Sequence, residues 1–269
     1  MSEESRPSMD EFELLDHPEI LQFIFYPRRD FYAQPRVANA SSHLIPVDEG
    51  ISISCRFYLA DGKAPNILFF HGNGEIASDY DQIAPLFTQI GVNFFVADYR
   101  GYGSSGGQPT FSAMMKDAHP VFDGFKNILK QEGYSGKLFM MGRSLGSASA
   151  IELAFNHQDE MGGLIIESGF ASVGRLVDLI DVPVDRLGFD RQKLSFNVER
   201  IASITIPTLI IHGEYDNLIP LQHGRDLYRS SGAKDKQLMV IPGATHNDIF
   251  LVGMDDYLKA MKEFVIAQS

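Results

Sequence analysis

Cysteine, tryptophan and basic residues are the scarce components of this 269-residue chain. It has no tryptophan and a single cysteine, Cys55, so an internal disulfide is excluded. Its 23 lysine and arginine residues are outnumbered by 35 aspartate and glutamate residues, which gives a formal net charge of −12. The phosphates of nucleic acids and anionic lipid surfaces repel a chain this acidic. We therefore expect neither a nucleic-acid partner nor an anionic membrane surface as partner.

Long apolar runs and targeting patterns are also missing. The longest apolar runs are far shorter than the roughly 20 residues that a helix needs to span a bilayer, so we expect no integral membrane segment. The N-terminal stretch MSEESRPSMDEFELL is acidic and polar and lacks the pattern of a secretory signal. We expect a cytoplasmic location. No histidine pair has metal-site spacing such as HExxH, so we predict no metal and no other cofactor.

What the sequence does contain is a regular alternation of short apolar runs with segments of helical periodicity. The runs lie at residues 67–70, 92–97, 138–141, 163–166, 208–211 and 237–241. Such alternation predicts one α/β domain over residues 1–269, with a mostly parallel sheet and helices on both faces. An antiparallel hairpin is expected first, over residues 43–59. Functional groups of such sheets gather at the carboxyl ends of the strands.

Two segments depart from this rhythm. An N-terminal extension of about residues 1–40 is too apolar between residues 12 and 32 for a floppy tail, so we expect a helix packed on the body. The insertion at about residues 171–206 shows no clear strand and reads as a small helical lid over the site. The alternative for this insertion is an ordinary crossover helix with a long loop.

The stretch KLFMMGRSLGSASAIELAFN, residues 137–156, is the strongest functional signal in the chain. It predicts a strand, a sharp turn and a helix, with Ser144 at the apex of the turn. Gly142 and Gly146 flank the serine where side chains would obstruct so tight a turn. The alternative is a glycine-rich connection with an idle serine. A second GxSxG centres on Ser105, but no apolar helix follows it, so we expect a surface loop there.

A serine hydroxyl needs an adjacent base, and the base needs a carboxylate to fix its tautomer. Ser144, Asp216 and His246 follow one another in the chain order of the nucleophile-elbow hydrolases. Glu214 and Glu167 are rival carboxylates, but both lie at strand ends, whereas Asp216 lies out in a loop that could reach a histidine. His71 and His212 each end a strand before a glycine and are expected to bond locally.

Acyl transfer also needs two donors for the developing oxyanion. The backbone amide of Leu145 is one candidate, since it follows the nucleophile at the start of a helix. The other is expected from the HGNG loop at residues 71–74, where the backbone is unencumbered. We predict the amide of Asn73, with Gly74 as the alternative.

Five motifs make the sequence similar to the α/β-hydrolase superfamily. They are HGNG at 71–74, DYRGYGSS at 98–105, GRSLG at 142–146, HGEYDNLIP at 212–220 and GATHND at 243–248. Within it, the chain resembles small-lid serine hydrolases of the α/β-hydrolase-domain group, some of which are esterases or protein depalmitoylases. The resemblance implies an eight-stranded sheet whose second strand is antiparallel. It also implies a set of site residues: nucleophile Ser144, acid Asp216, base His246, and oxyanion donors Asn73 and Leu145. The cysteine-rich N-terminal segment of the depalmitoylases has no counterpart here.

These observations predict a serine hydrolase acting on small-molecule carboxylic esters through an acyl-Ser144 intermediate. Thioesters could follow the same path. A short lid covers only a modest cavity, so small or medium acyl groups are expected. One alternative is a serine peptidase or amidase of the prolyl-oligopeptidase type, although such enzymes usually carry a large extra domain. The other is a non-catalytic binding protein on a hydrolase scaffold.

Overall fold

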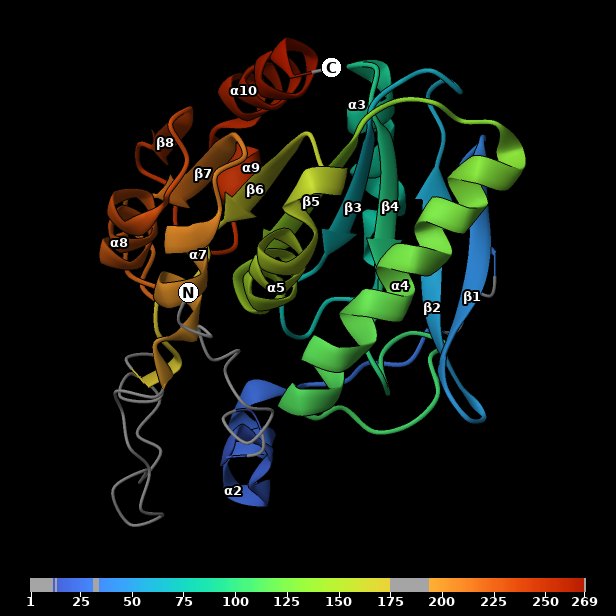
Figure 1. Cartoon of the computed structure of the whole chain (residues 1–269), viewed down its shortest axis with the longest axis horizontal. Helices are drawn as coiled ribbons and strands as arrows, with labels where there is room; N and C mark the ends of the chain where they lie inside the picture. The colour runs from blue at the N-terminus through green and yellow to red at the C-terminus, as the bar shows by residue number, and fades with distance from the viewer. Residues whose placement is uncertain (1–11, 13, 31–33, 175–193, 269) are drawn as a thin grey trace, which may run out of the picture.

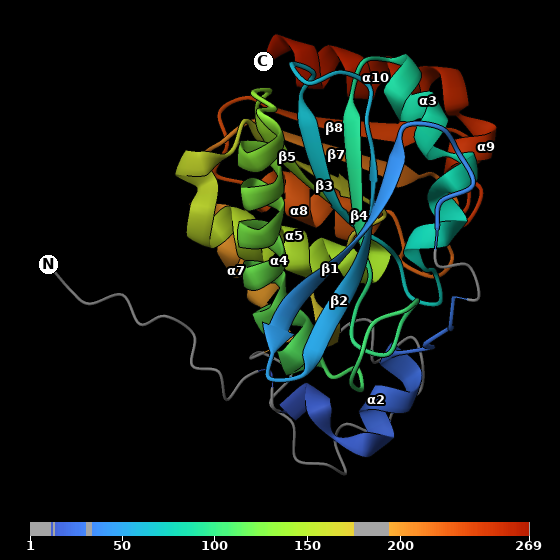
Figure 2. The same ribbon diagram turned by 90° about the vertical axis from the view of Figure 1, so that its right-hand side faces the viewer.

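A computed structural model of the chain describes residues 12, 14–30, 34–174 and 194–268. These residues form an eight-stranded sheet in the order β1-β2-β4-β3-β5-β6-β7-β8, with helices packed on its two faces (Figure 1; Figure 2). The strands are β1 (Ala40–Asp48), β2 (Ile51–Tyr58), β3 (Asn66–Phe70), β4 (Asn93–Ala97), β5 (Leu138–Arg143), β6 (Gly163–Glu167), β7 (Thr208–Gly213) and β8 (Lys236–Ile241).

The strand directions confirm the predicted sheet. β1 and β2 form the expected antiparallel hairpin, and β2 pairs antiparallel with β4. Every other neighbouring pair is parallel. β2 is therefore the antiparallel second strand that the resemblance implied, and the parallel strands all end at the same edge of the sheet.

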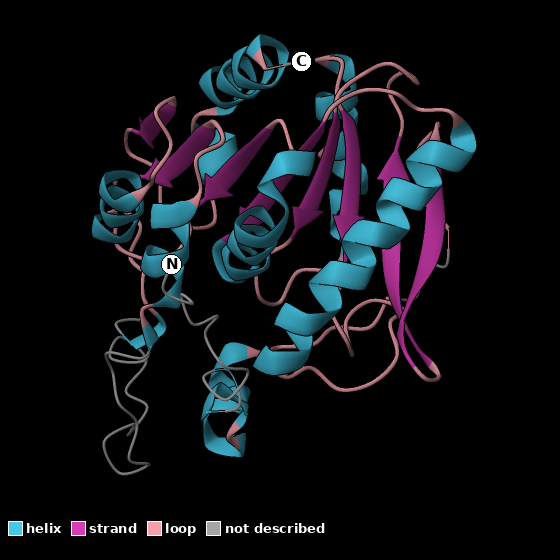
Figure 3. Ribbon diagram, in the orientation of Figure 1, coloured by secondary structure: helices cyan, strands magenta, loops and turns pink. Residues whose placement is uncertain are grey.

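Alternate side chains of the parallel strands serve two separate cores, which explains why these strands read as continuous apolar runs. Leu68 and Phe70 point to one core, and Ile67 and Phe69 to the other. The first core is covered by α4 (Phe111–Glu132), α5 (Ser147–His157), α7 (Phe196–Ser203) and α8 (Gln222–Ser230). The second is covered by α3 (Ala84–Gln89), α9 (Ile249–Val252) and α10 (Met254–Ala267) (Figure 3).

Two expected helices are shorter than predicted, and a proline lies in the first turn of the shorter helix in both places. The N-terminal helix α2 spans only Pro18–Ile24, after a 3-10 turn, η1 (Leu14–Asp16), and it begins at Pro18, where the missing N–H of proline would have had no partner in the helix. It does pack on the body, since Ile20 is fully buried. Between β3 and β4, where the alternation predicts one helix, the chain forms a 3-10 helix, η2 (Ala77–Gln82), followed by α3, with Pro85 in the first turn of α3.

The lid prediction cannot be followed along its length, because residues 175–193 lie outside the described part of the chain. At the end of the predicted insertion, α7 packs on α5 with Phe196 and Ile201 buried. Throughout the described ranges, no helix combines the length and apolarity needed to traverse a bilayer.

Candidate active site

Ser144 lies at a tight turn between β5 and α5, as the sequence predicts. Its φ is 51°, in the left-handed region that side chains other than glycine rarely adopt. A Cβ atom on Gly142 would clash with the carbonyl of Gly146, and one on Gly146 would clash with the carbonyl of Phe70. Both glycines are therefore required by space, and the turn holds the serine in a strained backbone conformation at the strand end.

The structure brings Ser144, His246 and Asp216 into one chain of contacts. The Ser144 Oγ atom lies 3.0 Å from His246 Nε2, and His246 Nδ1 lies 2.7 Å from Asp216 Oδ2. All three side chains are buried. They follow β5, β8 and β7 respectively, so the parallel topology gathers them at the carboxyl edge of the sheet.

The carboxylate of Asp216 is held by several donors. Its Oδ1 atom accepts hydrogen bonds from the backbone amides of Leu218, at 3.0 Å, and Ile219, at 2.7 Å. Its Oδ2 atom lies 3.4 Å from Nε2 of His212, which also bonds the Ile219 carbonyl at 2.7 Å. Burial raises the pKa of Asp216, but the hydrogen bonds from His212 and His246 outweigh it and hold the pKa well below its ordinary value. The group is therefore a carboxylate at working pH.

His212 thus bonds locally, as expected, and also faces Asp216, a contact that the sequence analysis missed. The signal available in the sequence is its position four residues before Asp216, at the end of the same strand.

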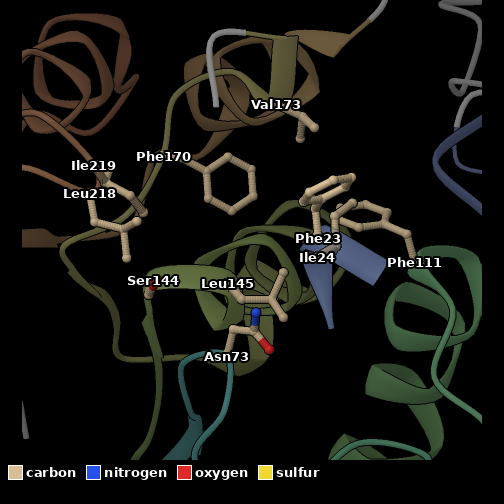
Figure 4. Close-up of a pocket in the computed structure, with 10 residues that line it drawn as sticks. All are labelled: Phe23, Ile24, Asn73, Phe111, Ser144, Leu145, Phe170, Val173, Leu218 and Ile219. Carbon is tan, nitrogen blue, oxygen red and sulfur yellow. The ribbon is translucent and has the colours of Figure 1, made fainter. Parts of the chain in front are cut away.

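A pocket opens beside the serine. Its described lining is almost wholly apolar and consists of Phe23, Ile24, Asn73, Phe111, Ser144, Leu145, Phe170, Val173, Leu218 and Ile219 (Figure 4). The cavity volume is about 120 Å³. Ser144 and the two predicted oxyanion residues, Asn73 and Leu145, lie at the same side of this pocket. Among the residues described, no backbone hydrogen bond occupies the amide of Asn73.

The rival residues lie apart from this arrangement and have other partners. Ser105 is buried and does not lie on the expected surface loop. Its Oγ atom accepts a hydrogen bond from the Ser54 amide at 2.9 Å. Glu214 accepts from the amide of Gly243 at 2.9 Å. His71 bonds the Gly72 carbonyl and Asp98, which shapes the local turn as expected.

A buried arginine next to the nucleophile is the largest feature that the sequence analysis missed. Arg143 ion-pairs with Glu75 and, at 3.1 Å, with Glu167. Its Nη2 atom donates to the carbonyl of His246 at 2.9 Å and to Asn247 Oδ1 at 3.2 Å. The available signal is an arginine at the end of an apolar strand, where a charge is buried only if it is paired.

Glu75 extends this cluster to the HGNG loop. Its Oε2 atom accepts from the amide of Gly72 at 2.8 Å and from the Tyr80 hydroxyl at 2.7 Å. Burial raises the pKa of Glu75, but the charges of Arg143 and His71 and the two hydrogen bonds together outweigh it, and the net shift is downward. One buried ion cluster therefore connects the turn at Ser144, the loop of His246 and the loop of Asn73.

Glu75→Gln is expected to lower the free energy of unfolding at pH 7 by about 2 kcal/mol, the scale of a hydrogen bond to a charged group. Because the pKa of Glu75 is lower in the folded state than its ordinary value of 4.5, this stabilisation is complete above pH 4.5. It is lost as the pH falls through the folded-state pKa. Urea unfolding from pH 7 downward should show the gap between the two proteins narrowing only below pH 4.5. A gap that is constant with pH would contradict the ion pair.

No group of three or more histidine, cysteine, aspartate or glutamate side chains in the described ranges is placed to hold a metal ion. The charged residues near the site form ion pairs with one another. The chemistry that the site can perform is that of a hydroxyl, an imidazole and a carboxylate in series. Such a series can transfer an acyl group to the hydroxyl.

The chain matches the family model described as "Serine aminopeptidase, S33" over residues 63–187 and 190–250, well over half its length. Human alpha/beta hydrolase domain-containing protein 17B is 32% identical over 224 residues, covering 81% of this chain and 72% of the relative. Alpha/beta hydrolase domain-containing protein WAV2 of Arabidopsis thaliana is 29% identical over 218 residues, covering 76% and 70%.

Solved structures share the fold. An esterase of Pyrococcus furiosus superposes with a TM-score of 0.72 at 17% identity, covering 91% of this chain and 98% of the esterase. Est1E of Butyrivibrio proteoclasticus, solved with ferulic acid, superposes with a TM-score of 0.68 at 22% identity, covering 84% and 98%. Together with the sheet order and the sharp turn at Ser144, these matches show that the chain belongs to the α/β-hydrolase superfamily, in the serine aminopeptidase family whose model it matches.

Proposed function

We propose that this protein is a serine hydrolase that cleaves carboxylic esters of small or medium acyl groups. The observation that carries the proposal is the contact series Ser144–His246–Asp216 opening into a small apolar pocket. The series provides a nucleophile with its base, and the pocket provides a place for an acyl chain. Thioesters contain the same acyl group and are included in the proposed substrate class.

In the acylation half-reaction, the Ser144 Oγ atom attacks the ester carbonyl while its proton passes to His246 Nε2. Asp216 accepts a hydrogen bond from His246 Nδ1 and stabilises the imidazolium that forms. The backbone amides of Asn73 and Leu145 donate to the oxyanion of the tetrahedral intermediate. The intermediate collapses as the carbon–oxygen bond to the alcohol breaks, and the imidazolium returns its proton to the departing alcohol.

In the deacylation half-reaction, a water molecule takes the place of the alcohol. His246 Nε2 removes a proton from this water as its oxygen attacks the acyl-Ser144 carbonyl. The second tetrahedral intermediate releases the carboxylic acid, and Ser144 Oγ recovers its proton from the imidazolium. No step uses a metal or a redox cofactor, so turnover is expected to be unaffected by a chelator.

Peptide hydrolysis is the competing function, because the matched family model is described as a serine aminopeptidase. An aminopeptidase must hold the α-ammonium group of its substrate, which calls for a carboxylate near the scissile bond. The described lining of the pocket contains no aspartate or glutamate. One protein that shares the fold is an esterase, and another binds the carboxylic acid ferulic acid, the class of product that ester cleavage releases. Both likenesses also favour ester substrates.

A fluorophosphonate probe, followed by mapping of the labelled peptide, tests the proposal directly. Labelling is expected at Ser144, and p-nitrophenyl esters are expected to be cleaved fastest when the acyl chain is short or medium. Aminoacyl p-nitroanilides measured in parallel serve as peptidase substrates. Faster turnover of these anilides would favour the peptidase, and absence of both labelling and turnover would favour a non-catalytic scaffold.

A further inference from the structure

The N-terminal segment of residues 18–30 contacts the candidate site at more than one point. It contains α2 and the extended stretch that follows it. Phe23 and Ile24, at the end of α2, line the pocket opposite Leu218 and Ile219, and Ser144 lies beside Leu218 (Figure 4). Phe23 is 39% exposed and Leu218 is 50% exposed. These two side chains therefore stand at the mouth of the pocket, one on each wall.

The stretch after α2 holds the side chain of Asn73. The backbone amide of Tyr26 donates to Asn73 Oδ1 at 2.8 Å, and the hydroxyl of Tyr102 donates to the same oxygen at 2.7 Å. The Tyr26 amide also lies 2.8 Å from the Tyr102 oxygen, so the three groups form a closed hydrogen-bonded set. Burial raises the pKa of Tyr102, so its hydroxyl remains a donor at working pH.

The next residues fix the same loop from its other side. Arg28 Nη1 donates to the carbonyl of Gly74 at 3.0 Å and pairs with Asp79 at 2.7 Å. The carbonyl of Arg28 accepts from the amide of Gly103 at 2.8 Å, and the Gly103 carbonyl accepts from the amide of Asp30 at 3.1 Å. Arg28 and its neighbours thus tie the loop at residues 73–74 to the loop that contains Tyr102.

We propose that residues 23–28 are part of the catalytic site, with Phe23 and Ile24 selecting the acyl chain and Tyr26, with Tyr102, positioning the Asn73 amide. The proposal deepens the ester-hydrolase function and rests on it. An oxyanion donor contributes only while its N–H is aimed at the oxygen, so a hydrogen bond that fixes the Asn73 residue acts on the transition state. Tyr26 and Tyr102 touch no substrate atom and are positioning residues.

The pocket-wall part is tested with Phe23→Ala, a change at a half-exposed side chain that the fold should tolerate. The substitution removes a ring from this wall and leaves more room for an acyl chain. The ratio of kcat/KM for long acyl chains to kcat/KM for short ones is therefore expected to rise about tenfold. Leu251→Ala is the matched control, because Leu251 is 75% exposed and is not part of the described pocket lining. An unchanged chain-length profile in Phe23→Ala would overturn this part.

The positioning part is tested with Tyr102→Phe, which removes the hydroxyl that donates to Asn73 and keeps the ring. The expected result is a kcat about tenfold lower at nearly unchanged KM, because the loss falls on the transition state rather than on ground-state binding. Tyr58→Phe is the matched control: Tyr58 is also buried and loses a hydroxyl contact of 2.7 Å, to Asp81, away from the pocket. Equal kcat values in the two variants would overturn this part.

The proposed ester-hydrolase function and the proposed role of residues 23–28 can be disproved independently of each other. If the wild-type protein is not labelled by fluorophosphonate and cleaves no ester, the proposed function is wrong. If it is labelled and active while Phe23→Ala and Tyr102→Phe behave like their controls, only the role of residues 23–28 is wrong. Thermal unfolding of each variant, measured alongside, shows whether a lower kcat is caused by unfolding of the variant.

Discussion

Replacing Ser144 by alanine is expected to reduce ester turnover by about 10⁶-fold, the typical cost of losing a triad nucleophile. Only the hydroxyl is removed. Gly142 and Gly146 still permit the turn, and alanine needs no more space than serine at a φ of 51°. The free energy of unfolding should therefore change little. Steady-state kinetics with a p-nitrophenyl ester, together with urea unfolding, measure the two quantities.

Ser105→Ala is the matched control, since Ser105 lies at the centre of the second GxSxG. Its hydroxyl is buried and accepts the Ser54 amide. Its loss is expected to lower stability by about 1 kcal/mol and to leave kcat near the wild-type value. Ser144→Ala should thus lose turnover and keep its stability, whereas Ser105→Ala should keep its turnover and lose stability. A large loss of kcat in Ser105→Ala with normal turnover in Ser144→Ala would mean that the nucleophile is Ser105 and not Ser144.

The parallel strands and the turn at Ser144 could be predicted because their determinants are local. β3, β4 and β6 are buried along their whole length, so every residue in them must suit a core. The turn needs two small residues at fixed distances from the serine, which a short sequence pattern expresses in full. The division of the helix between residues 76 and 90 was not predicted, although Pro85 in the first turn of α3 is a signal for a helix start.

The contacts around the loops of the candidate site could not be predicted, because they join residues far apart in the chain. Arg143 meets Glu75 across 68 positions and the carbonyl of His246 across 103. Tyr26 meets Asn73 across 47 positions. Spacing rules describe neighbours along a helix or a strand, whereas these bonds depend on side-chain direction at the edge of a folded sheet. Local patterns in the sequence indicated the candidate site residues but not the residues that hold their loops in place.

Replacing Asp216 by asparagine is expected to lower kcat by about 10⁴-fold while preserving the backbone. An amide carries no charge to stabilise the imidazolium of His246, and its NH2 group can hold the ring in the wrong tautomer. The pKa of Asp216 lies well below its ordinary value, so the carboxylate stays ionised through the working pH range. It therefore contributes no step of its own to the pH–rate profile.

The contact with His246 also separates Asp216 from its neighbour Glu214. Asp216 Oδ2 lies 2.7 Å from His246 Nδ1, so replacing this carboxylate acts directly on the imidazole. Glu214→Gln is the control, because Glu214 lies two residues away and bonds the Gly243 amide instead. Its kcat is expected to stay near the wild-type value. A loss of kcat of similar size in both variants would mean that Asp216 is not the acid paired with His246.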